Sequence, residues 1–357
     1  MGRERPGPEQ AFLLHASLFA MANLGMLKRL AVLVLWLAIF SLRATAVYGF
    51  DLRNFQHLVV FGDSLSDNGN SFASVGRPQV PYFHGRWSNG PNWVDYFSYF
   101  SGLNQHFLPA TAFLENRGTN FAVAGSNSAL LAGQIGTYLA TTGGRAFAND
   151  LYVIWIGAND FLQGLKATIT VSDIEEGIVS LREAGARNFL LINLPDISLT
   201  PDVRAHGTAT DLAAKQYVFM VNVALQAQIP YHALFFGVDV MLIDVNTPFT
   251  QLVNTRALSV SGLGRVGFSN SSGSAFNPGT GAVVANPNRY VFWDGFHPTT
   301  LVHYVTGWFI FHSAFPGTSS VPLANSSASP ERIAVLSTTS GKVKVTNRFK
   351  QSEHFGE

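Results

Sequence analysis

Ser64 lies between two aspartates in the stretch VVFGDSLSDNGN (59–70), directly behind an apolar run. Such a stretch is compatible with a serine nucleophile on a turn, with a calcium-binding loop, or with a polar turn that caps a helix. The calcium interpretation fails on spacing. If Asp63 is the first ligand, Leu65 takes the third position and Asn68 the position where the sharp turn requires glycine. The nucleophile and the plain turn therefore remain open.

Three later stretches hold the partners that a serine nucleophile needs. A serine hydroxyl needs an adjacent base, which His297 in DGFHPTT supplies, and Asp294 can orient the imidazole. The tetrahedral oxyanion needs donors, and we expect them to be the backbone N–H of Ser64, the backbone N–H of Gly125 and the side-chain amide of Asn159. Taken one at a time, each stretch is also compatible with an ordinary helix start or cap.

The nucleophile elbow G-x-S-x-G of the usual α/β-hydrolases is absent here, because Ser66 stands where its second glycine would be. Near the site stretches, Asp63 and Asp67 are expected to bond loop backbone, and His84 to be solvent-exposed or satisfied rather than to line a cleft. Ser88 or Asn89 is expected to cap the helix that follows, whose aromatic residues are expected to lie in the core.

Short apolar runs alternate with helical periodicity along most of the chain, which indicates a three-layer α/β/α sandwich with a parallel sheet. Because ligands collect beyond the carboxyl ends of parallel strands, the candidate residues should meet at one edge. The expected strands are 57–62, 151–157, 188–193 and 239–244, and the expected helices are 92–100, 171–185, 211–228 and 301–315. Residues 257–288, rich in Ser, Gly and Asn, are expected to form a long irregular loop.

The composition limits the classes of function. The 357 residues are 47% hydrophobic and 13% charged, which suits a globular protein with a large core. The formal net charge is +1, so nothing favours nucleic acid as a partner. Cysteine is absent, which excludes disulfides, thiolate nucleophiles and Cys-based metal sites.

The amino-terminal pattern predicts export. Residues 26–49 combine two cations, an apolar run and a small-residue cleavage site, as in a signal peptide. An uncleaved anchor is the alternative, although the run of about 13 residues is shorter than the ~20 that a span needs. Residues 1–25 are interpreted as an unused upstream extension, and residues 316–357 as a poorly ordered tail or linker to which RIAVLS could add an edge strand.

Together the GDSL stretch, Gly125, GAND and DGFHPT resemble the GDSL esterase/lipase family, also called SGNH hydrolases, over residues 50–315. GRWSNGPNWVDYF and LINLPDISLTP are also similar to stretches in one branch of that family. The resemblance implies a flavodoxin-like, five-stranded parallel sheet in the order 2-1-3-4-5. It implies Ser64, Asp294 and His297 as catalytic residues, the three oxyanion donors named above, and no metal or organic cofactor. One departure is Val123-Ala124-Gly125, where many members have two adjacent glycines.

The function expected from these observations is that of a secreted serine esterase or lipase acting through an acyl-enzyme on Ser64. Acyl transfer and hydrolysis of acetylated carbohydrates are alternatives on the same site, and a non-catalytic surface-binding module is the alternative from another class. The expected partners are small-molecule, lipid or carbohydrate esters, with transient contact to a membrane or polysaccharide surface. The sequence does not indicate an oligomeric state.

Overall fold

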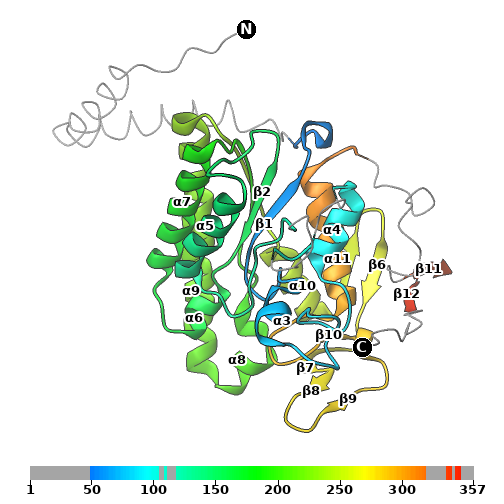
Figure 1. The fold of residues 1–357 in the computed structure, drawn as a ribbon. Coiled ribbons are helices and arrows are strands. Elements are labelled where there is room, and N and C mark those ends of the chain that lie inside the picture. Colours follow the sequence, from blue (N-terminus) through cyan, green and yellow to red (C-terminus); the bar gives the residue numbers. More distant parts are fainter. Residues whose placement is uncertain (1–48, 104–107, 111–117, 319–334, 340–341, 347–357) are drawn as a thin grey trace, which may run out of the picture. The chain divides into compact units, whose positions relative to one another are not determined.

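The computed structural model describes residues 49–103, 108–110, 118–318, 335–339 and 342–346, and a parallel sheet lies at the centre of the described fold (Figure 1). Its four strands are adjacent in the order β1-β2-β3-β4 and all run parallel. They are β1 (Leu58–Gly62), β2 (Leu151–Trp155), β3 (Asn188–Ile192) and β4 (Asp239–Ile243). The four strand predictions are thus confirmed to within a few residues at each end.

A fifth, shorter extended segment lies along the outer edge of β1. Backbone hydrogen bonds join Phe121 N–H to Val60 O at 2.7 Å and Val123 N–H to Gly62 O at 3.1 Å, and Val60 pairs with Asn120 in parallel. Counting this segment as the second strand gives the predicted order 2-1-3-4-5. It pairs too briefly to be a strand of the sheet, so the sheet has four strands rather than the predicted five.

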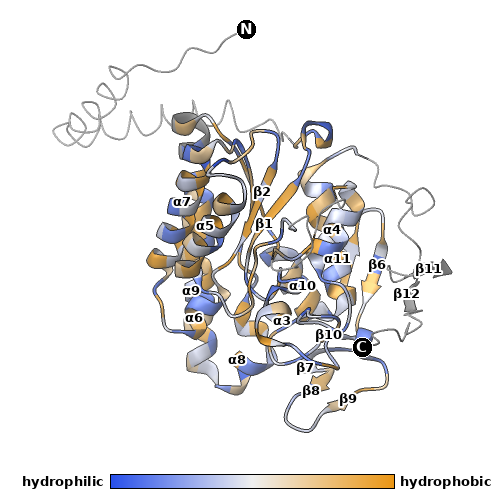
Figure 2. Cartoon of the chain, viewed as in Figure 1, coloured by the Kyte–Doolittle hydropathy of each residue, from blue (hydrophilic) through white to orange (hydrophobic). Residues whose placement is uncertain are grey.

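Helices cover both faces of the sheet, as the continuous apolar strands predict. On one face, Val59, Phe61 and Tyr152 pack with helices α5 (Leu131–Thr141), α7 (Ala167–Ala184) and α9 (Thr208–Phe236). On the other face, the alternate residues Leu58, Val60 and Val153 pack with α4 (Trp93–Ser101) and α11 (Thr300–Ala314). Figure 1 shows these two helical layers, and Figure 2 shows the apolar character of β1 and β2. The three-layer α/β/α sandwich is confirmed.

The remaining helices are short and lie mostly at the carboxyl ends of the strands. They are α3 (Asn70–Val75), α6 (Ala158–Leu162), α8 (Pro201–Ala205) and α10 (Asn246–Thr255), with 3₁₀ turns η1 (Leu52–Asn54), η2 (Ser128–Leu130), η3 (Ile197–Leu199) and η4 (Pro287–Arg289). Each short helix follows one strand of the main sheet along the chain: α3 follows β1, α6 follows β2, α8 follows β3 and α10 follows β4. A ligand site is expected at this edge of the sheet.

Residues 257–288 contain short strands, so the prediction of an irregular loop is wrong. Three small sheets form here and with β10 just beyond, and their buried apolar residues, such as Leu258, Val260 and Val266, stand singly between polar residues, which is why no apolar run marked them. Their strands are β5 (Ala257–Val260), β6 (Gly264–Gly267), β7 (Asn270–Ser274), β8 (Phe276–Asn277), β9 (Ala282–Val283) and β10 (Tyr290–Phe292).

The two ends of the chain hold predictions that the structure tests little. The extension and nearly all of the signal peptide predicted before residue 50 lie outside the described residues. In the predicted tail, β11 (Val335–Thr339) pairs with β12 (Lys342–Thr346) as an antiparallel pair rather than as an edge of the main sheet. None of the helices in the described ranges combines the length and the apolar character that crossing a membrane requires.

Candidate active site

Ser64 lies on a tight turn immediately after β1. The backbone N–H groups of Ser66 and Asp67 both donate to the carbonyl of Asp63, at 3.0 and 2.9 Å, so the chain reverses around Ser64. Gly62, at the end of β1, is required by a close approach to β2: a Cβ there would lie 2.4 Å from the carbonyl oxygen of Trp155. The turn therefore leaves the Ser64 side chain at the carboxyl edge of the sheet, only partly buried.

Asp67 holds the loop in place from inside. Its two carboxylate oxygens accept hydrogen bonds from the backbone N–H groups of Gly69, Asn70, Ser71 and Ala124 and from the Ser71 hydroxyl. The expected structural role of Asp67 is confirmed. Because Ala124 belongs to the neighbouring segment, this carboxylate also fixes the loop that contains Gly125 relative to the loop that contains Ser64.

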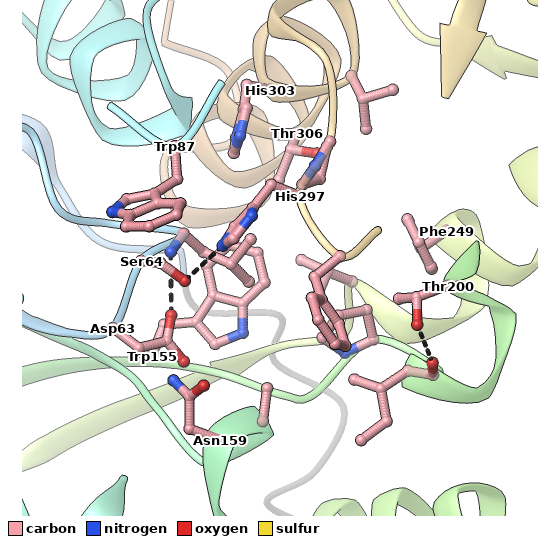
Figure 3. Close-up of a pocket in the computed structure, with 18 of the residues that line it drawn as sticks. Asp63, Ser64, Trp87, Trp155, Asn159, Thr200, Phe249, His297, His303 and Thr306 are labelled. Carbon is pink, nitrogen blue, oxygen red and sulfur yellow. Dashed lines mark hydrogen bonds between the residues drawn. The ribbon is translucent and has the colours of Figure 1, made fainter. Parts of the chain in front are cut away.

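The imidazole of His297 joins Ser64 to Asp294. His297 Nε2 is 2.8 Å from Ser64 Oγ (Figure 3). His297 Nδ1 is 2.8 and 3.0 Å from the two carboxylate oxygens of Asp294. Both residues lie on a short loop between β10 and α11 that is closed by a hydrogen bond from Trp293 N–H to His297 O at 2.7 Å. The structure thus brings together the three predicted catalytic residues, although 230 positions separate Ser64 from Asp294 in the sequence.

Asp294 is held as a carboxylate. Burial by itself would raise the pKa of this carboxyl, but the charge of His297 and hydrogen bonds from His297 and Tyr82 lower the pKa to about 2. The Tyr82 hydroxyl donates to Asp294 Oδ2 at 2.6 Å, and the backbone N–H groups of Phe296 and His297 donate to Oδ1 at 2.9 and 2.8 Å. An ionised, fully bonded Asp294 can fix the orientation of His297 and stabilise its protonated form.

Two aromatic residues at the site were missed by sequence reasoning. Tyr82 contacts Asp294 as described, and the ring centroid of Trp87 is 5.1 Å from that of His297 at an interplanar angle of 34°. Both residues come from the loop around GRWSNG (85–90), a stretch that is similar to one found in a branch of the family. Nothing in the local sequence indicates which distant side chains they contact.

The three predicted oxyanion donors come from three neighbouring loops. Gly125 has φ +79° and faces open space, so a glycine suits a backbone that must approach a ligand. Within the described ranges, no acceptor bonds the backbone N–H of Ser64 or of Gly125. The amide of Asn159, in the first turn of α6, donates one N–H to Ser126 O at 3.0 Å, which leaves a second N–H on the nitrogen. Figure 3 shows this side chain pointing toward the loop of Asp63 and Ser64.

Several local predictions around the site are corrected. Asn92, rather than Ser88 or Asn89, caps α4 through a capping box with Asp95. The Ser88 hydroxyl donates to Pro298 O and the Asn89 side chain accepts from Thr300 N–H, so both tie the start of α11 to this loop. As expected, His84 is exposed, and the aromatic residues of α4 are core residues.

An apolar pocket of about 310 Å³ opens beside Ser64. Ser64, Gly125, Asn159 and His297 all line it, together with side chains from α10 and α11. Within the part of the chain that the structure describes, no three His, Asp or Glu side chains are grouped so that they could hold a metal ion. The arrangement can do nucleophilic chemistry: a hydroxyl, a base and three candidate donors line one cavity, and an ionised carboxylate contacts the base from behind.

Asp63 is expected to make stability depend on pH. Burial raises the pKa of its carboxyl to about 7, against the opposite effect of the hydrogen bond from Leu65 N–H. Between the unfolded pKa of ~3.9 and pH ~7 the folded state binds more protons, so the free energy of unfolding should fall as pH rises. Asp63→Asn should match the wild type below pH ~4 and exceed it by a few kcal/mol above pH ~7, at ~1.4 kcal/mol per pKa unit. Urea unfolding of both proteins from pH 4 to 8 measures this, and a difference that stays constant with pH would contradict it.

Comparison with known proteins gives matches over most of the described fold. The family described as GDSL-like Lipase/Acylhydrolase matches residues 58–306. Thermolabile hemolysin of Vibrio parahaemolyticus is 28% identical over 275 residues, which cover 69% of this chain and 60% of the hemolysin. Phosphatidylcholine-sterol acyltransferase of Aeromonas hydrophila is 26% identical over 319 residues, which cover 75% of this chain and 93% of that protein. A solved G-D-S-L family lipolytic protein from Veillonella parvula covers 72% of this chain and 95% of its own, at 17% identity and a TM-score of 0.39.

Proposed function

Because this chain belongs to the GDSL-like lipase/acylhydrolase family and is an ester hydrolase, we propose that it is a secreted serine esterase that forms an acyl-enzyme on Ser64. One observation carries the proposal. The carboxylate of Asp294, the imidazole of His297 and the hydroxyl of Ser64 form an unbroken chain with 2.8 Å at each link, and the chain ends at an apolar pocket. Such a chain activates a hydroxyl for attack on a carbonyl carbon.

The chemical steps follow from the proposed roles. Ser64 Oγ attacks the ester carbonyl carbon while its proton moves to His297 Nε2, and the carbonyl oxygen becomes an oxyanion bound by the donors of Ser64, Gly125 and Asn159. Cleavage of the C–O bond releases the alcohol, which takes the proton from His297. A water molecule then attacks the acyl carbon with the same base, and the carboxylic acid leaves as Ser64 recovers its proton.

Two alternatives remain distinguishable from hydrolysis. Acyl transfer uses the same acyl-enzyme and an alcohol in place of water, and the Aeromonas hydrophila relative is named as an acyltransferase. A non-catalytic binding module would require no intact relay, whereas each contact of this relay is within hydrogen-bond distance. The relay therefore favours an enzyme that acts on esters over a binding module.

The proposal is tested with a panel of p-nitrophenyl esters, with and without an added alcohol such as glycerol. The proposal predicts release of p-nitrophenol and of free acid. Formation of the glycerol ester in place of the acid would show that acyl transfer dominates. A pure, folded protein that turns over no member of the panel would overturn the esterase proposal and favour the binding module.

Export through residues 26–49 is the second part of the proposal. If the leader is cleaved, the exported protein should begin near Val47 or Phe50 and be recovered in the soluble fraction. Intact-mass measurement of protein recovered from outside the cytoplasm reads the start directly. A mass that retains the apolar run 30–42, with the protein in the membrane fraction, would contradict secretion and favour an anchor.

A further inference from the structure

The pocket beside Ser64 is a slot that crosses the carboxyl ends of all four strands. Its floor takes one position from each strand end: Leu65 after β1, Trp155 at the end of β2, Ile197 after β3 and Val245 after β4. Helix α11 lines the opposite side of the slot. The α11 residues Val302, Val305 and Phe309 follow the three- and four-residue spacing of one helical face. Ser64 therefore lies at one end of the slot and α10 at the other.

The far part of the slot suits a hydrocarbon. Val245, Leu252 and Val305 are 4, 2 and 3% exposed, so buried apolar side chains form much of its wall, and Phe249 and Phe309 beside them are partly exposed. The acidic and basic residues of the lining, Asp63, His297 and His303, belong to the Ser64 end, where Figure 3 shows His303 beside His297. Burial and the charge of His297 lower the pKa of His303 to about 3, so it is neutral at pH 7.

The slot lining also contains uncharged polar groups, among them the hydroxyl of Thr200 and the indole N–H of Trp155. The hydroxyl of Thr200 donates to Ile197 O at 2.8 Å and is already satisfied (Figure 3). The indole nitrogen of Trp155 is buried with no hydrogen-bond partner within the described ranges. A charged or sugar-like group placed here would exchange its hydration shell for few partners, the Trp155 N–H among them, whereas an alkyl chain gains free energy for each methylene that it buries.

Two independent measures give the length of the chain that fits. Three strand spacings of ~4.8 Å separate β1 from β4, about 14 Å in all, and an extended chain advances ~1.2 Å per bond, so about twelve bonds span the slot. The whole cavity, including the part beside Ser64 and Asn159, has about 310 Å³, about twice the ~150 Å³ that holds the six carbons of benzene, so it has room for a chain of this length.

We propose that this slot binds the acyl chain of the substrate and selects straight chains of about ten to fourteen carbons; the inference rests on the proposed function. The acyl group stays attached to Ser64 from acylation to deacylation and can remain in the apolar slot throughout. The alcohol must leave and be replaced by water beside His297, so it is assigned to the Ser64 end and not to the slot. The preferred substrates are then esters of medium-chain fatty acids, and acetylated carbohydrates would leave the slot empty.

Two substitutions at the far end should change chain length in opposite directions. Val245→Phe fills the slot beyond β4 and should lower kcat/KM for the twelve-carbon ester at least tenfold while leaving the four-carbon ester within about twofold. Phe249→Ala lengthens the slot and should move the optimum several carbons upward. Phe219, on α9, is 67% exposed, so Phe219→Ala is the matched control. It should change neither the activity on the twelve-carbon ester nor the preferred chain length.

The test compares p-nitrophenyl esters from two to sixteen carbons, below the concentrations at which they form micelles. For the wild type, kcat/KM should rise at least a hundredfold from four to about twelve carbons, since each buried methylene contributes about threefold to fourfold. Equal activity on all chain lengths, with hydrolysis intact, would overturn the slot but not the proposed function; no hydrolysis of any ester would overturn the proposed function itself. A second series of acetate esters of longer alcohols should show no such rise, and a rise that follows the alcohol instead would overturn the assignment to the acyl chain.

Binding provides a readout that does not depend on turnover. Ser64→Ala should bind dodecanoate at least tenfold more tightly than butyrate, and adding Val245→Phe should remove that difference. Calorimetric titration and thermal unfolding are measured on the same preparations. If Val245→Phe proves unstable, the opposite shift in Phe249→Ala decides the question, and an unchanged optimum in a folded Phe249→Ala protein would contradict the slot.

Discussion

Ser64→Ala is expected to lower ester turnover by about 10⁴-fold or more while leaving the protein folded. The substitution removes one hydroxyl from a partly buried turn, and the carbonyl of Asp63, which holds that turn through two backbone bonds, is untouched. Nothing else within the proposed relay can supply the attacking oxygen. Steady-state kinetics on the p-nitrophenyl panel and thermal unfolding of the same preparation measure both parts of the expectation.

His297→Ala is the partner variant for this prediction. Because Ser64 and His297 act as one unit, the single variants should lose similar activity, and the double variant should lose little more than either. Retention of more than about 1% of the wild-type turnover by a pure Ser64→Ala protein would exclude Ser64 as the nucleophile. Independent, multiplying losses in the double variant would show that the two residues do not act together.

Asn159→Ala is expected to lower kcat by roughly 10²–10³ and to leave KM comparatively little changed. The amide is proposed to donate to charge that exists only in the tetrahedral state, so its loss affects the transition state and not the bound ester. Asn159 follows Gly157, the N-cap of α6, and makes no cap bond itself. Its bond to Ser126 O instead orients the amide, and losing that bond should destabilise the protein by about 1 kcal/mol.

Asn127→Ala is the matched control for Asn159. Its amide donates to Gln163 Oε1 at 2.7 Å on the adjacent loop, so the same change of residue type tests loop stability without removing a proposed oxyanion donor. The control should keep kcat within about twofold. An Asn159→Ala protein that melts early but keeps near-normal kcat per folded molecule would exclude Asn159 from the oxyanion site and assign it a structural role only.

The layers of the fold were predictable because each element carries its own signal. The strands are continuous apolar runs, and both faces of the sheet are covered, so burial and sequence pattern agree at residues such as Val59 and Val60. The predicted helices correspond to α4, α7, α9 and α11, of which 301–315 matches α11 at 300–314 most closely, whereas 211–228 ends eight residues before α9 does at Phe236. The small sheets between 257 and 288 lacked that signal, because their strands have only two to five residues and mix single buried apolar side chains with polar ones.

The structure brings together the residues that the sequence predicts to react, whereas the residues that support them could not be predicted. Ser64, His297 and Asp294 have residue types and neighbours that indicate chemistry by themselves, and parallel strands bring loop ends together. The residues around Tyr82 and Trp87 in the sequence give no comparable indication of a role at the site. The bond from Tyr82 to Asp294 joins residues 212 positions apart, and only the packing of the β10 loop against the GRWSNG loop creates it. The same holds for Asn89, which meets α11 across 211 positions.

Covalent trapping of the nucleophile tests the central claim most directly. Diethyl p-nitrophenyl phosphate should phosphorylate a serine that is activated by an adjacent imidazole, and mass spectrometry of proteolytic peptides identifies the modified residue. We expect one diethylphosphoryl group on Ser64 of the wild-type protein, at least ~10²-fold slower labelling of His297→Ala, and none of that peptide in Ser64→Ala. A label on any other residue, or a folded wild-type protein that is not labelled, would contradict the account.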